Sequence, residues 1–363
     1  HRTALHDYRL VSVAEGLIHP WSMAFLPGGD MLVTERPGRL RIVRDGELLE
    51  DPVPGVPEVL FEGQGGLLDV VPHPDFANNR LIYMSFSKPV GGGQATTAVV
   101  RGTFENDRFT MTDEVFEAVS EGRPGHYGSR LAFDPDGYLF ITVGDRQIAP
   151  SGGPAELAAH PAQDVTNHHG TLNRIQDDGT VPADNPLVGQ NGAMPEIWSY
   201  GHRNSQGLAI HPETGQPWLT EHGPQGGDEV NVPEPGANYG WPVIGYGVNY
   251  RSGAIIHHAT HEEGMEQPVH IWVPSIGVSG LMFYTGDQFP EWRGNLFAGG
   301  LAGQNLVRLT VEGDEVLASE DVVLRTVGRI RDVRQGPDGY IYLATDVRGG
   351  EAAALYRMEP ARQ

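Results

Sequence analysis

The sequence predicts an all-β fold, a six-bladed β-propeller whose blades are four-stranded antiparallel sheets. Three observations support this prediction. The chain of 363 residues contains 49 glycines and 28 prolines, which favour turns, and it shows little helical periodicity. A unit consisting of an apolar strand, a Pro/Asp/Gly turn and a second apolar strand recurs six times. The six units leave about 60 residues each, which suits a four-stranded blade with some long loops.

The six predicted hairpins follow one another along the chain. They are expected at residues 22–35, 67–85, 130–142, 207–220, 280–298 and 330–344, and the fifth is the loosest match to the repeated unit. Residues 146–196 and 247–275 lack the unit, and we expect long loops between strands there. No linker divides the chain, so residues 1–363 are expected to form a single domain.

The composition excludes several classes of function. The chain is 39% hydrophobic and 20% charged, and no apolar run approaches the ~18 to 20 residues of a membrane helix, so we expect no membrane span. Cysteine is absent, which excludes disulfides and thiol catalysis. A formal net charge of −22 repels nucleic acid, so no nucleic-acid partner is expected. In so acidic a chain, clustered arginine indicates an anionic ligand.

The geometry of the hairpins predicts where polar side chains gather. Residues equidistant from a turn lie opposite each other, and equivalent ends of propeller hairpins share one face. This rule places the following residues at the open ends of hairpins: His126 with Asp145, Gln206 with residues 221–223, Arg331 with Asp346, and Gln64 just beyond the second hairpin. We therefore expect these residues to converge around the central axis on one face.

Two sets of residues in this region indicate a chemical function. His126 beside Asp145 fits a general base with a carboxylate that orients it, although the spacing also fits a structural histidine bonded to a turn aspartate. Arg329 and Arg331 lie two apart on a strand and so point to one face, which favours an anion between them. Pairing of these arginines with acidic neighbours such as Asp332 or Asp346 is the alternative.

The region from Trp198 to Tyr246 is the densest in motifs. It contains Trp198-Ser-Tyr-Gly-His-Arg-Asn-Ser-Gln-Gly-Leu208, Thr220-Glu-His-Gly-Pro-Gln-Gly-Gly-Asp-Glu-Val-Asn231 and Asn238-Tyr-Gly-Trp-Pro242. With Gly63-Gln-Gly-Gly-Leu-Leu68, Gly125-His-Tyr-Gly-Ser-Arg130 and Gly328-Arg-Ile-Arg-Asp332, these motifs resemble the soluble PQQ-dependent glucose/sorbosone dehydrogenase family. The resemblance covers roughly residues 18–346 and is closest to the aldose sugar dehydrogenase branch.

The resemblance implies a six-bladed propeller that oxidises the anomeric hydroxyl of aldoses to lactones, with the hydride passing to PQQ. It implies catalytic roles for His126, Asp145 and Arg203. It also implies cofactor binding by Gln64, His126, Arg203, Asn204, Arg329 and Arg331. An external electron acceptor, a monomeric or homodimeric state and a periplasmic or secreted location, with the signal peptide not part of this sequence, belong to the same expectation.

Two Ca²⁺ roles are implied by the same resemblance. The backbone carbonyls of Gly223 and Pro224 match those of an ion that also binds PQQ, and carbonyl oxygens are hard ligands suited to Ca²⁺. Glu229 and the Tyr239 carbonyl resemble a second, structural site, with Asp228 as a less certain neighbour. A solvated acidic loop is the alternative reading of Asp228 and Glu229.

One position departs from the family pattern. After Leu301 the family usually carries a lysine that contacts PQQ, whereas this chain has Ala302. One cofactor contact is therefore missing or comes from another residue. Two other functions stay open at this point: a Ca²⁺-dependent lactonase or hydrolase, which would use the metal to activate water, and a non-catalytic propeller that binds sugar or protein.

Overall fold

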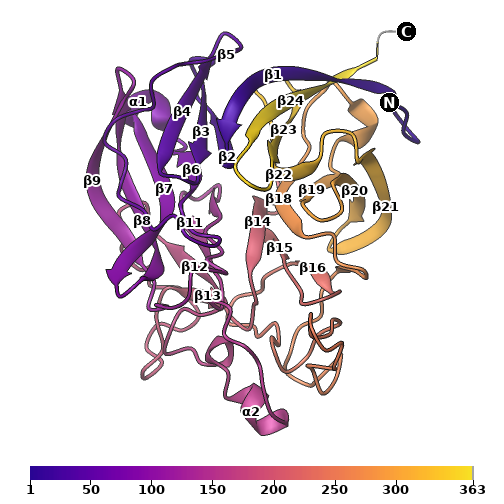
Figure 1. Ribbon diagram of the computed structural model, residues 1–363. Helices are drawn as coiled ribbons and strands as arrows, with labels where there is room; N and C mark the ends of the chain where they lie inside the picture. Colours follow the sequence, from indigo (N-terminus) through magenta and orange to yellow (C-terminus); the bar gives the residue numbers. More distant parts are fainter. Residues whose placement is uncertain (362–363) are drawn as a thin grey trace.

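The computed structural model describes residues 1–361 and consists of six four-stranded antiparallel sheets arranged as a six-bladed β-propeller (Figure 1). The predicted fold class is confirmed. In Figure 1 the blades follow one another around the molecule in chain order, from indigo through magenta to yellow, and the first and last strands meet.

Each blade is one antiparallel sheet. The first contains β2 (Pro20–Phe25), β3 (Met31–Glu35), β4 (Arg39–Arg44) and β5 (Glu47–Leu48), and the second contains β6 (Leu67–Pro72), β7 (Leu81–Gly91), β8 (Gln94–Glu105) and β9 (Arg108–Glu117). The third contains β10 (Leu131–Phe133), β11 (Leu139–Val143), β12 (Thr171–Ile175) and β13 (Ile197–Ser199), and the fourth contains β14 (Ser205–Ile210), β15 (Pro217–Glu221), β16 (Asp228–Asn231) and β17 (His270–Trp272). The fifth contains β18 (Val278–Phe283), β19 (Leu296–Gly300), β20 (Asn305–Glu312) and β21 (Glu315–Leu324). The sixth contains β22 (Arg329–Gln335), β23 (Ile341–Asp346), β24 (Ala352–Pro360) and β1 (Tyr8–Ile18).

The ring is closed by the two ends of the chain. Strand β1 pairs antiparallel with β24, with Leu10 opposite Met358, so the last blade takes its outer strand from the N-terminal region. This pairing couples the first and last blades and covers the edge of β24. Figure 1 shows the two strands side by side.

Each predicted hairpin corresponds to two neighbouring strands of one blade. In the first five blades these are the first two strands of the sheet, and in the sixth blade they are β22 and β23. The turns of the second and fifth hairpins contain a short helix each, α1 (Phe76–Asn79) and the 3₁₀ helix η2 (Pro290–Trp292). The repeated unit therefore predicted the scaffold correctly.

The register of the sixth hairpin differs from the prediction. Arg329, not Arg331, lies opposite Asp346, because a bulge falls between Ile330 and Asp332. An extra residue in one strand shifts the pairing beyond it by one position. A similar irregularity lies between Ser205 and Gly207, so that Gln206 is the additional residue of the fourth hairpin.

The expectation of loops at residues 146–196 and 247–275 is wrong in part. The first segment contains helix α2 (Pro154–Ala158), the 3₁₀ helix η1 (Pro161–Gln163) and strand β12, and the second ends in β17. These strands were missed because long connections rather than Pro/Asp/Gly turns lead into them. Residues of both segments pack together, since Leu157 of α2 lies in one cluster with Val243 and Ile244, against which Ala259 and Met265 of the second segment pack.

Within residues 1–361, no helix is both long and apolar enough to cross a membrane.

Arg130 lies at the centre of the ring and joins five blades. Its side chain is 1% exposed, and its Nη1 lies 3.0 Å from Asp332 Oδ1 and 3.6 Å from Asp69 Oδ1. Its Nε donates to the Gln206 carbonyl at 2.7 Å, and its Nη2 donates to the carbonyls of Trp21 and Arg331. The guanidinium also lies over the Trp21 ring, 4.0 Å from the centroid. A single buried cation thus holds residues of β2, β6, β14 and β22.

We predict that Arg130→Met lowers the free energy of unfolding by about 3 to 5 kcal/mol, because it leaves the carboxylates of Asp69 and Asp332 buried beside fewer cations. Urea unfolding followed by tryptophan fluorescence measures this loss. Arg325→Met is the matched control at an exposed arginine and is expected to change stability by less than about 0.5 kcal/mol. A loss below about 1 kcal/mol for Arg130→Met would contradict the role given to Arg130.

Candidate functional site

Three adjoining cavities open where the hairpins end. The central cavity, of about 330 Å³, is lined by His19, Trp21, Arg36, Gln64, Leu68, Tyr127, Gly128, Gln206, His222, Leu301, Arg329, Arg331, Asp346, Arg348 and Gly349. The outer cleft, of about 560 Å³, is lined by Gln64, His126, Asp145, Gln147, Ile148, Ala149, Pro150, Arg203, His222, Pro224, Trp241, Asn249, Tyr250, Arg251 and Ile256. The small cavity, of about 20 Å³, includes Arg203, Glu221, His222, Gly223, Pro224, Glu229 and Tyr239. His222 lines all three, so they form one site.

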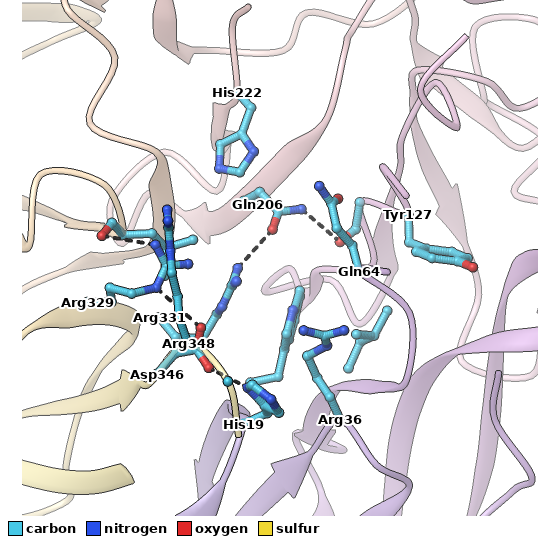
Figure 2. Close-up of a pocket in the computed structure, with 15 residues that line it drawn as sticks. His19, Arg36, Gln64, Tyr127, Gln206, His222, Arg329, Arg331, Asp346 and Arg348 are labelled. Carbon is cyan, nitrogen blue, oxygen red and sulfur yellow. Dashed lines mark hydrogen bonds and ion pairs between the residues drawn. The ribbon is translucent and has the colours of Figure 1, made fainter. Parts of the chain in front are cut away.

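The central cavity is strongly cationic. Four arginines line it (Arg36, Arg329, Arg331 and Arg348), and Asp346 is the one carboxylate among its lining residues. Asp346 already contacts two partners, His19 Nδ1 at 2.8 Å and Arg329 Nε at 3.5 Å. Figure 2 shows Arg329, Arg331 and Arg348 on one side of the cavity and Gln64 and Tyr127 on the other. Positive charge therefore exceeds negative charge here, in a chain whose net charge is −22.

Arg331 is the buried cation of this cavity. Burial lowers its pKa to about 9, and the charges of Arg36, Arg329 and Arg130 act in the same direction, against the attraction of Asp346. Its side chain is still protonated at neutral pH, and Nη1 donates to Gln206 Oε1 at 3.1 Å. A buried cation without a full counter-charge is costly, so this cavity favours an anionic ligand.

His126 and Asp145 meet in the wall of the outer cleft. His126 Nδ1 lies 2.5 Å from Asp145 Oδ1, and Asp145 Oδ2 accepts a hydrogen bond from Trp241 Nε1 at 2.8 Å. The backbone of His126, in the segment between β9 and β10, has φ 46°, a left-handed value that is uncommon outside glycine. Gln64 supports the turn, since its Oε1 accepts from the His126 backbone N–H at 2.9 Å.

The electrostatics of this pair favour a neutral imidazole. Burial lowers the pKa of His126, and the charges of Arg203 and Arg146 add to this effect, while Asp145 opposes it. Burial alone would raise the pKa of Asp145, but the attraction of His126 and Arg203 outweighs it, so the carboxyl stays ionised. An ionised carboxylate only accepts, so Nδ1 carries the proton and Nε2 is left as a free base.

Arg203 and Asn204 lie at different depths. Arg203 lines the outer cleft and the small cavity, where Nη1 donates to the carbonyls of Gly223 at 2.8 Å and His222 at 3.1 Å. Asn204 is fully buried, and its Oδ1 accepts from the Gly128 N–H and from Gln206 Nε2. Asn204 therefore supports the wall of the central cavity without lining it. The Arg203 side chain, in contrast, lines two of the cavities itself.

The carbonyls expected to bind the first Ca²⁺ already have partners. The Gly223 carbonyl accepts from Arg203 and from the Tyr250 hydroxyl at 3.2 Å, and the Pro224 carbonyl accepts from Ser275 Oγ at 3.3 Å. Each carbonyl oxygen has two lone pairs, and Pro224 lines both the outer cleft and the small cavity. A hard cation fits these oxygens if Arg203 moves away from Gly223.

The small cavity fits a metal ion more directly. Glu221, Glu229 and Tyr239 line a space of about 20 Å³, which has room for a single ion. Burial, with the charge of Glu221 next in importance, raises the pKa of Glu229 well above its usual range. Asn231 Nδ2 donates to both carboxylates, at 2.7 Å to Glu221 and 3.1 Å to Glu229. Glu221 is buried and also accepts from the Arg203 backbone N–H at 2.6 Å, with His202 Nδ1 at 3.1 Å, whereas Glu229 is half-buried and has Asn231 as its hydrogen-bond partner among residues 1–361. Two carboxylates bridged by one neutral amide favour a divalent cation, and the oxygen ligands suit Ca²⁺.

Asp228 has a structural position instead. Its Oδ1 accepts from the Gly223 N–H at 3.0 Å and its Oδ2 accepts from the Val278 N–H at 2.9 Å. Both oxygens thus hold the loop that carries Gly223 against the next blade.

Several residues of the site were not predicted from the sequence. The hairpin rule, applied to the first hairpin, would have pointed to His19 and Arg36, which lie at its open end. Trp241 lies in a motif that was noted without a role. Arg348 follows β23 in a loop, and no pattern in the sequence marks it as part of the central cavity.

Comparisons with known proteins identify the family of the chain. The family described as Glucose / Sorbosone dehydrogenase matches residues 17–357. The aldose sugar dehydrogenase YliI of Escherichia coli is 46% identical over 341 residues, covering 92% of this chain and 89% of YliI.

Two solved structures extend the comparison. The apo form of the soluble aldose sugar dehydrogenase of Escherichia coli has a TM-score of 0.89 at 42% identity, covering 98% of this chain and 100% of that one. The PQQ-bound aldose sugar dehydrogenase of Streptomyces coelicolor has a TM-score of 0.75 at 28% identity, covering 99% of both chains. The resemblance inferred from the motifs is confirmed, and the chain belongs to the glucose/sorbosone dehydrogenase family of oxidoreductases.

Proposed function

We propose that this protein is a PQQ- and Ca²⁺-dependent aldose sugar dehydrogenase that oxidises the anomeric hydroxyl of aldoses to lactones. The observation that carries the proposal is the contact between two chemically different cavities. A central cavity with four arginines adjoins an outer cleft that contains the His126–Asp145 pair. An anionic cofactor in the first and a sugar in the second would lie next to each other. The PQQ-bound relative from Streptomyces coelicolor supports this choice of cofactor.

The protein's own residues supply the base. His126 Nε2 accepts the proton of the anomeric hydroxyl, and Asp145 holds Nδ1–H so that Nε2 points its lone pair toward the cleft. Trp241 fixes the second oxygen of Asp145, and its ring lines the same cleft. The low pKa of His126 keeps the base unprotonated at neutral pH.

The arginines would hold the cofactor. Arg329 and Arg331 project into the central cavity, where bidentate contacts to carboxylates suit the guanidinium group. Gln64 lines both the central cavity and the outer cleft, which places an amide at their junction. When bound, PQQ supplies the two-electron acceptor that amino-acid side chains lack. Arg203 lines the outer cleft and would stabilise negative charge there once it leaves the Gly223 carbonyl.

Ca²⁺ would occupy two places. One lies at the carbonyls of Gly223 and Pro224, and the other lies at Glu229 and the Tyr239 carbonyl, with Glu221 beside them. We further propose a periplasmic or secreted protein that acts as a monomer or homodimer and passes electrons to an external acceptor.

A hydrolytic propeller would need a metal-bound water but would have no use for a cavity with four arginines. A non-catalytic propeller would not require a base, and so would not require a buried His–Asp pair that leaves Nε2 free.

The purified apoprotein, reconstituted with PQQ and Ca²⁺, is expected to reduce an electron-accepting dye in the presence of aldoses. Omission of either PQQ or Ca²⁺ should abolish the reaction. Dye reduction across a panel of aldoses and alditols measures this, because alditols have no anomeric hydroxyl. Equal activity on alditols, or no activity with any sugar, would contradict the proposal.

His126→Ala is expected to lower kcat by about 10² to 10⁴, because the general base is lost. The Kd for PQQ, measured by calorimetry, should change little. In the wild type, kcat/KM should fall on acidification only below about pH 6.5, the usual pKa of histidine, because burial lowers the pKa of His126. A variant with near-normal turnover would exclude His126 as the base.

Glu229→Gln is expected to remove one bound Ca²⁺ per molecule in a calorimetric titration and to reduce the rise in Tm that Ca²⁺ produces. A ligand that binds only the native state stabilises it by about 2.7 kcal/mol at a hundred times its Kd. Glu234→Gln, at an exposed carboxylate that follows the same strand, is the control and should respond to Ca²⁺ like the wild type. An unchanged stoichiometry and Tm response in Glu229→Gln would show that the ion does not bind at this position.

A further inference from the structure

The arginines of the central cavity differ in how they are held. Arg36 donates to the carbonyls of Gly63 and Gly65, and Arg331 donates to Gln206. Arg329 lies 3.5 Å from Asp346 and also donates to the Leu301 carbonyl. Arg348 is different, since it is exposed at the mouth of the cavity, and among residues 1–361 its side chain has no hydrogen-bond partner and no carboxylate within 4.0 Å. An unpaired cation at the wall of a cationic cavity is a group available to a ligand.

Arg348 also stands between two cavities. A side cavity of about 440 Å³ adjoins the central one and is lined by Leu301, Ala302, Gln304, Val327, Gly328, Arg329, Asp346, Val347 and Arg348. Leu301, Arg329, Asp346 and Arg348 line both cavities. Arg348 can therefore place its guanidinium over the edge of the central cavity that is nearest to Ala302.

The fifth blade contributes no charged side chain to this edge. Leu301 and Ala302 follow β19, and neither can bind a carboxylate through its side chain. The basic groups at this edge all come from the sixth blade, from Arg329 at the start of β22 and from Arg348 after β23. A carboxylate bound here would have to be neutralised from the sixth blade.

The loop that carries Arg348 is built to approach the cavity closely. Gly349 and Gly350 have φ values of 92° and 81°, which favour glycine. Gly349 lines the central cavity, and a Cβ at Gly350 would lie 3.4 Å from His19 Nε2. The two glycines that follow Arg348 therefore let the backbone approach the cavity wall.

We propose that Arg348 binds a carboxylate of the cofactor at the edge next to Ala302 and supplies the cationic contact that the side chain at position 302 lacks. The proposal rests on the proposed function, because it takes PQQ as the ligand of the central cavity. It adds a cofactor-binding residue in a loop outside the propeller strands.

Calorimetric titration of PQQ into the apoprotein, at fixed Ca²⁺, tests this role without an activity assay. Arg348→Met should weaken PQQ binding by about ten-fold to a hundred-fold, the usual contribution of one hydrogen bond to a charged group. Arg325→Met removes the same charge from an exposed position that lines neither cavity and should leave the Kd unchanged. The double variant Ala302→Lys/Arg348→Met should recover most of the lost affinity.

The outcomes separate the inference from the proposed function. Tight PQQ binding by the wild type with an equal Kd for Arg348→Met would overturn the role of Arg348 and leave the proposed function in place. A double variant as weak as Arg348→Met alone would also overturn it, because a cation at this edge would then not restore the contact. Absence of PQQ binding by the wild type would instead overturn the proposed function, and the inference with it.

Discussion

The arrangement of the site depends on the buried cation at the centre of the ring. Arg130 lies between Asp69 and Asp332 and donates to the carbonyls of Trp21, Gln206 and Arg331. These last three residues all line the central cavity. A charge without solvent must be matched by carboxylates and hydrogen bonds, so the five blades cannot shift independently without leaving part of this network unpaired. The interaction that joins the blades at the centre of the ring therefore also fixes the wall of the cavity.

Two cavities near this centre carry opposite excess charge. The chain as a whole is acidic, yet four arginines face one carboxylate in the central cavity, and the amide of Asn231 bridges two carboxylates, Glu221 and the half-buried Glu229, in the small cavity. Each arrangement is electrostatically incomplete by itself. An anionic cofactor would complete the first and a divalent cation the second. Between them, His126 is kept neutral by burial and by nearby arginines, which is the state that a base requires.

The sequence predicted the scaffold better than the details. Turn residues such as Pro, Asp and Gly act locally, so the six hairpins, and with them the number of blades, could be read directly. Strands β12 and β17 follow long connections, and their pairing is set by contacts distant in sequence, which a local pattern does not reveal. The bulge at Arg331 illustrates the same limit, because symmetric counting from the turn placed this residue opposite Asp346.

The candidate site was predictable where it lies at a hairpin end. His126 and Asp145 meet as the counting rule requires, and His19 and Arg36 obey the same rule in a hairpin to which it was not applied. Arg348 could not be found in this way, because its position depends on how a glycine-rich loop folds back toward the cavity. Asn204 was expected to face a ligand, and only the structure shows that its side chain is buried behind Gly128.

The central claim is that electrons leave a sugar in the outer cleft for PQQ in the adjoining central cavity. A single-turnover experiment tests it most directly: protein loaded with one equivalent of PQQ and with Ca²⁺ is mixed with an aldose, without any dye, and the cofactor absorbance is followed. We predict reduction of one equivalent of PQQ, with formation of one equivalent of lactone. An unchanged cofactor spectrum, with the aldose recovered intact or with a hydrolysis product formed instead, would contradict the claim.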